Sequence, residues 1–374
     1  MRILIVPDKF KGTLDAARVA KAIAAGWHAA RPKDVIHTLP MSDGGDGFGT
    51  VLGDLLGAEL RRTRTLDAAG RPRTARWWWS SRRGTAVIET AQSNGLALLP
   101  PGHYHPFDLD TRGVAPILRA ALAAGARSCL LGVGGSATND GGFGLALALG
   151  WQFLDPQGRA LSRWTDLDQL SELIPPAQSL PPCQFVVATD VSNPLLGPHG
   201  ASRVYGPQKG LKPEDFSKSE ACLRQLAKVV KRSLGFDSRS PGSGAAGGLG
   251  FGLQAFLGAR RELGFDVFAR MSKLDARLER CDLVITGEGS ADRSTLMGKG
   301  VGQLLAACER HPRPVILLAG RTDLGAKLPS GLIASGNLLD HVGERAALEH
   351  TARSLRSLAR HTASHFQSLP GNRR

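Results

Sequence analysis

Residues 130–144 combine the residue types that bind phosphate groups in proteins. A short apolar run, residues 129–133, leads into a glycine-rich loop, and a helical pattern begins directly after it. A strand that ends in such a loop brings backbone N–H groups and the positive end of a helix to one point. An ordinary strand-to-helix turn can have the same composition, but similar loops recur along the chain. The glycines let a ligand approach and the polar side chains supply donors: Gly134, Gly135, Gly141, Gly142, Ser136, Thr138 and Asn139.

Carboxylates and lysines occupy comparable loops after other expected strands. Parallel α/β sheets bind ligands at the carboxyl ends of their strands, and the loops expected at those ends hold these residues. Helix N-caps can explain one or two of the carboxylates, but four at equivalent places favour a site that handles a metal ion or a hydroxyl proton. The residues are Asp8, Asp43, Asp190 and Asp292, with Lys11 and Lys299.

Better-known phosphate motifs fit the chain poorly. Residues 132–137 match GxGxxA, and Asp155 lies about 20 residues beyond, where a dinucleotide fold places its acidic ribose ligand. However, residues 155–158 have the composition of a turn. Residues 298–300 lack the spacing and hydroxyl of a Walker A loop, and the kinase elements HRD and DFG are absent. Phosphoryl transfer on another scaffold remains, with glycine loops for phosphates, carboxylates for Mg²⁺ and the attacking hydroxyl, and lysines for developing charge.

Strands that alternate with helices are expected to position these loops, which predicts parallel α/β sheets. The three tryptophans at 77–79 alternate between two faces of a strand, which favours packing over a stacking platform. Strands are predicted at 2–6, 35–39, 63–66, 75–79, 85–89, 129–133, 185–189, 282–286 and 314–319, and helical patterns at 16–27, from 50, at 113–124, 223–234 and 344–366.

The bulk composition limits the function classes. At 374 residues the chain is long for one core, which predicts two domains. With 42% hydrophobic and 21% charged residues and no apolar run of about 20, we expect a soluble, cytoplasmic protein without membrane contact. The five cysteines lack metal spacing and are expected to be reduced. The net charge of +14 is dispersed and no nucleic-acid motif accompanies it, so small anionic substrates are favoured over nucleic acid.

Seven sequence blocks together resemble the glycerate kinase family, which includes the bacterial glycerate 2-kinases. Ser42 and Asp46 depart from the family pattern, where Ala and Glu are expected, and Phe48 and Gly49 are inserted before Thr50. The blocks follow one another from residue 7 to residue 300: PDKFKGTLDA (7–16), MSDGGDG (41–47), GVGGSATNDGGFG (132–144), ATDVSNPLLGPHGA (188–201), YGPQKG (205–210), GAAGGLG (244–250) and DLVITGEGSADRSTLMGKG (282–300).

The resemblance implies an ATP- and Mg²⁺-dependent kinase of D-glycerate, a monomer or homodimer, built from two α/β domains with mainly parallel sheets and a cleft between them. One domain, residues 67–281, is inserted into the other, residues 1–66 plus 282–374. Catalysis is assigned to Asp190 as the base, with Lys299, Asp43 and Asp292, and Mg²⁺ to Asp43 and Asp190. Glycerate is assigned to Asp8, Lys11, Asn193 and Lys9, and ATP to Gly134, Gly135, Ser136, Asn139, Asp140, Gly287 and Glu288.

The expected product is 2-phosphoglycerate. Three alternatives stay open at this point: phosphorylation at the 3-hydroxyl, a nicotinamide-dependent oxidoreductase of small hydroxy acids, and a non-catalytic sensor of small acids. The oxidoreductase would need an acid after a clear second strand, and the sensor would leave the carboxylate set degraded, whereas it is intact here.

Overall fold

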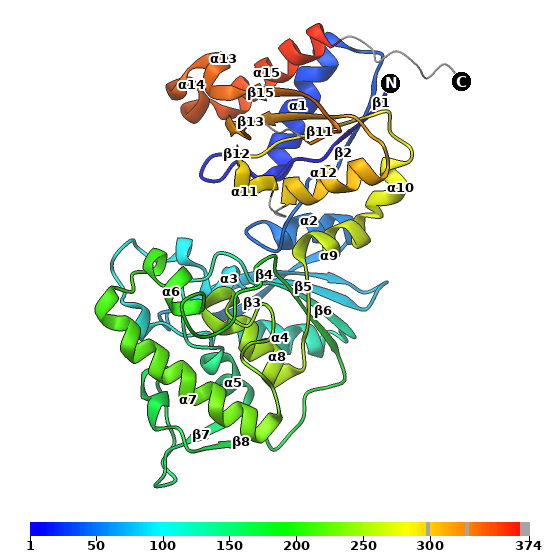
Figure 1. The fold of residues 1–374 in the computed structure, drawn as a ribbon. Coiled ribbons are helices and arrows are strands. Elements are labelled where there is room, and N and C mark those ends of the chain that lie inside the picture. Colours follow the sequence, from blue (N-terminus) through cyan, green and yellow to red (C-terminus); the bar gives the residue numbers. More distant parts are fainter. Residues whose placement is uncertain (297–299, 326–328, 367–374) are drawn as a thin grey trace. The chain divides into compact units, whose positions relative to one another are not determined.

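The computed structural model describes residues 1–296, 300–325 and 329–366 (Figure 1). The chain forms two compact α/β units. Unit 1 consists of Met1–Asp43 and the chain from Phe268 onward, and unit 2 is the inserted segment Gly44–Val267.

Unit 1 is built on a parallel five-stranded sheet in the order β15-β13-β11-β1-β2. Buried apolar runs form its central strands, as expected for a parallel sheet covered on both faces. The strands are β1 (Arg2–Ile5), β2 (Val35–Thr38), β11 (Leu283–Thr286), β13 (Val315–Ala319) and β15 (Leu332–Asn337), with a separate pair of β12 (Ser290–Asp292) and β14 (Arg321–Asp323).

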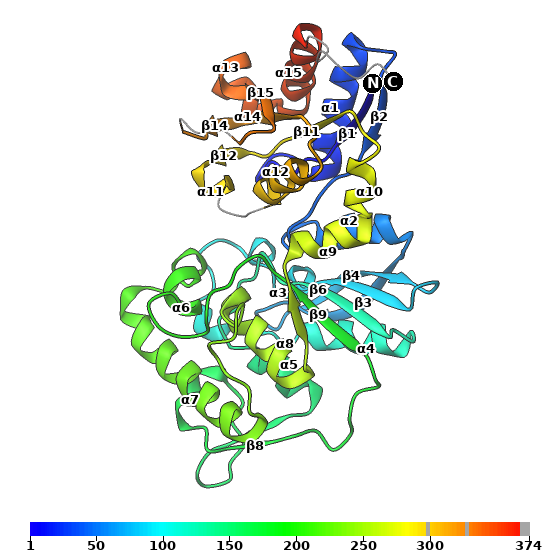
Figure 2. The ribbon, with the colours of Figure 1, turned by 45° about the vertical axis from the view of Figure 1, so that its right-hand side comes forward.

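Helices cover both faces of this sheet. The amphipathic α1 (Ala16–Ala30) and α15 (Thr351–His365) pack side by side on one face, and α12 (Gly300–Arg310) lies over the other (Figure 2). Gly26 allows the close approach of α1 to α15, because an added Cβ would lie 2.8 Å from Ala359 Cβ. The remaining helices are α9 (Gly264–Ser272), whose first residues belong to unit 2, α10 (Leu274–Leu278), α11 (Arg293–Leu296), α13 (Leu338–Val342) and α14 (Glu344–Glu349).

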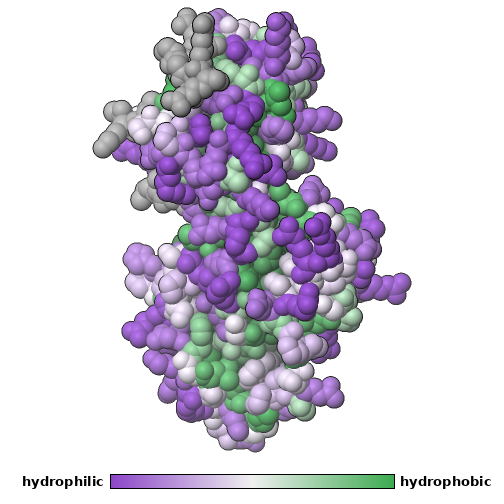
Figure 3. All heavy atoms as spheres, turned by 90° about the vertical axis from the view of Figure 1, so that its right-hand side faces the viewer, coloured by the Kyte–Doolittle hydropathy of each residue, from purple (hydrophilic) through white to green (hydrophobic). Residues whose placement is uncertain are grey.

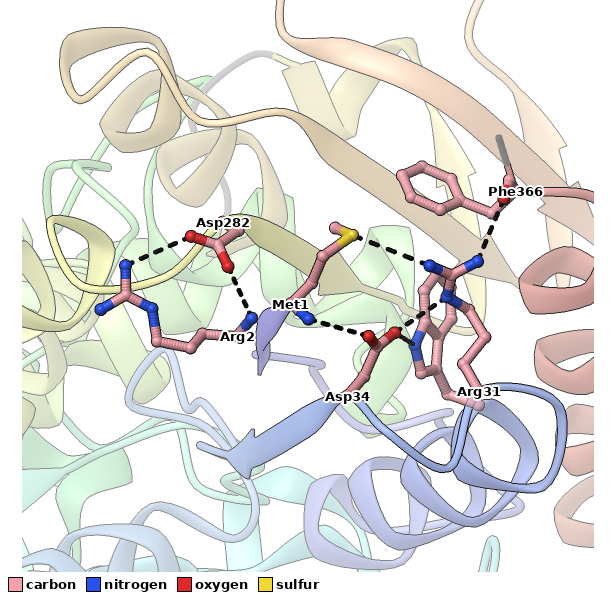
Figure 4. Close-up of polar contacts among 7 residues, drawn as sticks. Met1, Arg2, Arg31, Asp34, Asp282 and Phe366 are labelled. Carbon is pink, nitrogen blue, oxygen red and sulfur yellow. Dashed lines mark hydrogen bonds and ion pairs between the residues drawn. The ribbon is translucent and has the colours of Figure 1, made fainter. Parts of the chain in front are cut away.

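Asp34 links the start of β1 to the end of α1 through ion pairs with the Met1 ammonium and Arg31 (Figure 4). Its side chain is 5% exposed; Oδ1 accepts a hydrogen bond from the Met1 ammonium at 2.9 Å, and Oδ2 accepts from Trp27 Nε1 at 3.0 Å and Arg31 Nε at 2.9 Å. Burial by itself would raise the pKa of Asp34, but the three donors lower it below its ordinary value.

Replacing Asp34 by alanine is expected to lower the free energy of unfolding of unit 1 by about 2–3 kcal/mol at neutral pH, since it leaves partly buried donors without their acceptor. A carboxyl whose folded pKa is lowered stabilises the fold above its unfolded pKa, and this contribution is lost as the pH falls through the folded pKa. The difference should therefore shrink in acid. Hydrogen exchange of peptides from β1 and α1, followed as a function of pH, measures this difference in the free energy of unfolding. Asp15→Ala, which removes the exposed N-cap of α1 and an exposed ion pair with Arg18, should cost about 1 kcal/mol, and an equal loss in both variants would contradict the prediction.

Unit 2 contains a mixed six-stranded sheet in the order β10-β9-β6-β5-β4-β3. The first four strands pair in parallel, and the last two form an antiparallel edge. The strands are β3 (Glu59–Leu66), β4 (Pro72–Ser80), β5 (Thr85–Glu89), β6 (Ser128–Gly132), β9 (Gln184–Ala188) and β10 (Arg260–Glu262), with a hairpin of β7 (Gln152–Leu154) and β8 (Glu172–Ile174).

The helices of unit 2 enclose its main hydrophobic core. The amphipathic α7 (Phe216–Leu234) ends at Gly235, which adopts a left-handed backbone with φ 71°. The other helices are α2 (Phe48–Leu56), α3 (Ala91–Asn94), α4 (Val114–Ala123), α5 (Phe143–Leu149), α6 (Ala201–Tyr205) and α8 (Leu249–Leu257), with short 3-10 helices at Leu96–Leu98, Pro106–Asp108, Trp164–Gln169, Pro207–Lys209, Pro213–Asp215 and Ala245–Gly248.

The unit boundaries lie at 43/44 and 267/268, earlier than the expected 66/67 and 281/282. The residues between 44 and 66 join unit 2 because β3 pairs with β4, and α2 packs on β4. Gly49 and Gly53 of α2 lie against the Trp78 ring, whereas Trp77 and Trp79 enter the core on the other face, so the predicted alternation of the tryptophans is confirmed.

The surface drawn in Figure 3 is mostly hydrophilic, with smaller hydrophobic areas between the polar residues. Among the helices that the structure describes, none combines the length and apolarity needed to cross a membrane.

Candidate functional site

The glycine-rich loop between β6 and α5 exposes only its tip. Gly134 and Gly135 are accessible, whereas the polar residues from Ser136 to Asp140 are buried. Gly135 has φ 75°, a conformation that favours glycine. The tip therefore presents backbone to solvent, and the rest of the loop is anchored in unit 2.

Asp140 shapes this loop from inside the protein. Its Oδ2 accepts hydrogen bonds from Thr111 Oγ1 at 2.7 Å, Thr111 N at 2.9 Å and Gly144 N at 2.9 Å, and its Oδ1 accepts from Gly142 N at 3.1 Å. Burial raises the pKa of Asp140 in spite of these donors, and burial together with Asp140 raises the pKa of Asp110 to about 6. The carboxylate predicted to face ATP or Mg²⁺ is thus surrounded by donors of its own unit.

Asn139 also points inward. Its Nδ2 donates to Ser202 Oγ at 3.0 Å and to Ser219 Oγ at 2.8 Å, and all three residues are buried. The contacts attach the loop to α6 and α7, so the structure places Asn139 where it supports the backbone.

Lys209 lies beneath the loop tip, and the residue-by-residue assignment from sequence missed it. Its side chain is buried, and Nζ donates to Ser136 Oγ at 3.0 Å and to the Thr138 carbonyl oxygen at 2.8 Å. Burial lowers the pKa of Lys209 to about 7, although the charge of Asp140 opposes the shift. A glycine tip backed by an ammonium group that bonds neutral acceptors can bind an anion.

A second glycine segment, residues 244–252, packs directly on the first. Gly141 N donates to the Gly247 carbonyl oxygen at 3.1 Å, and Gly247 has φ 69°. An added Cβ at Gly248 would lie 2.7 Å from Gly141 Cα, and one at Gly142 would lie 2.7 Å from Gly252 Cα. The two backbones touch without intervening side chains, which fixes the path of the loop.

Residues 44–47 form a further wall of the unit 2 site. Gly134 N donates to the Gly44 carbonyl oxygen at 3.1 Å, and the exposed Asp46 carboxylate lies against Gly135. The buried Glu89 at the end of β5 accepts from Gly49 N at 3.0 Å, and burial raises the pKa of Glu89. Glu89 was not among the predicted residues, yet it anchors this segment.

Asp190 and Asn193 follow β9. Asp190 Oδ1 accepts a long hydrogen bond of 3.5 Å from Phe265 N at the start of α9. Asn193 Oδ1 accepts from the Tyr205 hydroxyl at 2.7 Å, and its Nδ2 donates to the His199 carbonyl oxygen at 2.8 Å. Asn193, predicted to bind substrate, therefore holds the loop that leads to α6.

Unit 1 brings Asp8, Lys9 and Asp43 together. Lys9 Nζ lies 3.8 Å from Asp8 Oδ1 and 3.7 Å from Asp43 Oδ1. Burial raises the pKa of Asp8 to about 6, an effect that Lys9 opposes and Asp43 reinforces. Lys11, on the same loop, is exposed.

Loops after neighbouring strands surround this cluster in unit 1. Asp8 N donates to the Gly287 carbonyl oxygen at 2.8 Å, and Gly320 N donates to the Glu288 carbonyl oxygen at 3.1 Å. Asp292 ends β12, and its backbone N–H lies 3.1 Å from Thr295 Oγ1. Gly300, the first residue of α12, lies beside Asp8, but Lys299 falls outside the described residues.

Within the described residues, no group of three or more His, Cys, Asp and Glu side chains is arranged to hold a metal ion. Asp155, the acid expected of a dinucleotide fold, accepts from Arg159 Nε at 2.7 Å and from Gln157 N at 2.9 Å. It closes the predicted turn, which leaves the oxidoreductase alternative without its ribose ligand.

The sequence pattern could have singled out Lys209, because it is the one cation within the turn-rich block 205–210. Lysine between glycine and proline turns is typical of a surface, however, and only packing against a segment 73 residues earlier buries it. Glu89 carried a weaker signal, a carboxylate at the end of a buried strand.

Comparison with known proteins agrees with the resemblance found in the sequence. The chain is 36% identical to the glycerate 2-kinase of Escherichia coli, over 96% of this chain and 97% of that protein. It is also 36% identical to the glycerate kinase of Bacillus subtilis, over 97% of each. The crystal structure of putative glycerate kinase 2 from Salmonella typhimurium LT2 superposes with a TM-score of 0.82 at 34% identity, covering 97% of both chains. A model of the glycerate kinase family matches residues 3–367, and the chain therefore belongs to this family.

Proposed function

We propose that this protein transfers the γ-phosphoryl group of ATP to the 2-hydroxyl of D-glycerate and releases 2-phosphoglycerate. The observation that carries the proposal is the accessible Gly134–Gly135 tip above the buried Lys209 ammonium, in a chain of the glycerate kinase family. A positive charge behind accessible glycine backbone suits a polyphosphate, whereas an uncharged ligand would gain little from it.

The ATP phosphates are assigned to unit 2. Backbone N–H groups at the loop tip would contact phosphate oxygens, and Lys209 would supply charge from below through Ser136. Asp140 and Asn139 act indirectly, because their hydrogen bonds hold the loop in place. This division of roles supports a preorganised phosphate site, which binds without the cost of ordering a loop.

Glycerate and Mg²⁺ are assigned to acidic and basic groups outside that loop. Asp8, Lys9 and Asp43 together carry one negative charge when both acids are ionised. The oxygens of the two carboxylates are the ligands that a hard cation prefers. Asp43 would hold Mg²⁺, with Asp190 as the second predicted ligand. The ion, when bound, neutralises charge on the phosphates. Lys9 and Lys11 are the candidates for the glycerate carboxylate. Gly287 and Glu288 remain assigned to ATP, and Asp292 and Lys299 remain assigned to catalysis.

The choice of hydroxyl depends on where the carboxylate of glycerate is held. The 2-hydroxyl and the 3-hydroxyl differ little in nucleophilicity, so position must decide between them. A lysine clamp close to the base presents the adjacent C2 hydroxyl, whereas C3 requires a clamp about one carbon–carbon bond farther away. The similarity to a glycerate 2-kinase favours the first arrangement.

Purified protein is expected to form ADP from Mg·ATP only when D-glycerate is present. Coupling the product to enolase without phosphoglycerate mutase should generate phosphoenolpyruvate, because enolase uses 2-phosphoglycerate. Phosphorus NMR identifies the ester independently.

Each alternative has its own outcome in this assay. A product that enolase accepts only after mutase is added would show transfer to the 3-hydroxyl. Turnover of NAD(H) with small hydroxy acids, without ADP formation, would reject the kinase. Binding of D-glycerate without any turnover would indicate a sensor.

A further inference from the structure

Two of the five cysteines are in direct contact, and the proposed reaction does not use them. Cys183 Sγ lies 3.6 Å from Cys129 Sγ in unit 2. Cys129 is part of β6, and Cys183 directly precedes β9, which pairs with β6. Cys222, Cys281 and Cys308 are buried elsewhere, and all five are free thiols. The contact joins residues 54 positions apart in the chain, so it is created by the sheet.

The two thiols differ in access. Cys129 is completely buried in the core of unit 2, whereas Cys183 is partly exposed and follows the exposed Pro181 and Pro182. The contact lowers the pKa of Cys183 and raises the pKa of Cys129, because the Cys129 thiol can donate to the Cys183 thiolate. An accessible thiol of lowered pKa beside a second thiol is the arrangement found in reversible oxidation sites.

We infer that Cys183 is a site of reversible oxidation by hydroperoxides, with Cys129 as its resolving partner. The Cys183 thiolate attacks the peroxide, an O–O bond breaks, and Cys183 becomes a sulfenic acid while the peroxide leaves as an alcohol or water. The Cys129 thiol then attacks the sulfenic sulfur, water leaves, and a Cys129–Cys183 disulfide forms. The two electrons lost by the thiols reduce the peroxide, and a dithiol reductant reverses the change.

The backbone permits this bond with a small local movement. Cys129 pairs with Phe185, two residues beyond Cys183, so the two side chains lie on the same face of the sheet. The sulfur atoms must approach by about 1.5 Å to reach a disulfide bond length near 2.05 Å. Cys183 precedes β9, so this movement falls in a loop residue and leaves the strand pairing intact.

Treatment of the purified full-length protein with hydrogen peroxide tests the inference. The count of free thiols under denaturing conditions should fall from five to three, and dithiothreitol should restore it. Mass spectrometry of the unreduced digest should find one linked pair of peptides, containing Cys129 and Cys183. Cys183→Ser should keep all four remaining thiols, whereas the matched control Cys281→Ser should fall from four to two.

Cys129→Ala separates the two steps, because a sulfenic acid at Cys183 then has no resolving thiol and should be captured by dimedone. If Cys129→Ala does not fold, Cys183→Ser at the partly exposed position still decides the outcome. A thiol count that stays at five, a disulfide mapped to Cys281 and Cys308, or a disulfide between two chains would each overturn the inference.

Discussion

Replacing Lys209 by methionine is expected to lower kcat/KM for ATP by about a hundredfold or more. Methionine keeps the length and apolar stem of lysine but removes the ammonium that donates to Ser136 and Thr138. Burying the ammonium costs desolvation energy, whereas its removal leaves the Ser136 hydroxyl and the Thr138 carbonyl oxygen without a donor, so the two effects oppose each other and the thermal stability of unit 2 should change much less than the activity. Steady-state kinetics and thermal unfolding measure the two effects separately.

The pH profile provides a second signature of Lys209. With a pKa of about 7, its ammonium is lost as the pH rises through neutrality. The kcat/KM for ATP reports ionisations of the free enzyme, so it should fall on the alkaline side of pH 7 in the wild type. Lys209→Met should lack this alkaline limb. ATP ionises in the same way in both assays, so the difference between the two profiles reports Lys209 alone.

Lys212→Met is the matched control for Lys209, since Lys212 is exposed three residues further along. It should keep wild-type kinetics. A Lys209→Met protein with normal kcat/KM, or one that loses activity only in proportion to its stability, would show that Lys209 is structural.

Asp190→Asn is expected to lower kcat about a thousandfold while KM for ATP changes little, if Asp190 accepts the hydroxyl proton of glycerate. Asparagine keeps the size of the side chain and can still accept from Phe265 N, so the loop after β9 should be preserved. The loss should therefore appear in the chemical step. Single-turnover kinetics with saturating Mg·ATP and D-glycerate measures that step directly.

Asp266→Asn makes the same chemical change at an exposed position beside Phe265 and should leave kcat unaffected. Retention of most of the wild-type kcat by Asp190→Asn would shift the role of the base to Asp43 or Asp292. A large rise in KM for ATP, or a clear loss of thermal stability, would instead indicate a positional role.

The sequence located the central strands well because their signal is local. Residues 85–89 were predicted without error, and the ends of β1, β6 and β9 lie within one or two residues of their predicted places. β15 was missed, because it is half exposed and its residues Ala-Ser-Gly-Asn have little strand preference. The single helix expected at 344–366 is two helices, since His350 leaves the helical conformation with φ −128° and ψ 37°.

The candidate site was predicted as a set of loops but not as a set of contacts. A carboxylate after a buried strand is visible in the sequence, yet nothing local distinguishes Asp140, whose oxygens face its own unit, from Asp46, which is exposed. The burial of Lys209 likewise depends on which distant segments pack together. Residue type indicates what a side chain can do, and the packing of the fold decides which partners it meets.

The bare backbone contact between the two glycine segments also affects how this protein can be recombined. Gly142 meets Gly252, and Gly248 meets Gly141, backbone against backbone, so at these contacts the opposite segment has no side chain whose shortening could make room for a new one. A substitution in either segment therefore has no compensating partner in the other. In chimeras made from two relatives, a crossover between these segments should give a folded protein only where both parents have the same backbone path in the two segments. The two segments should otherwise be taken from the same parent.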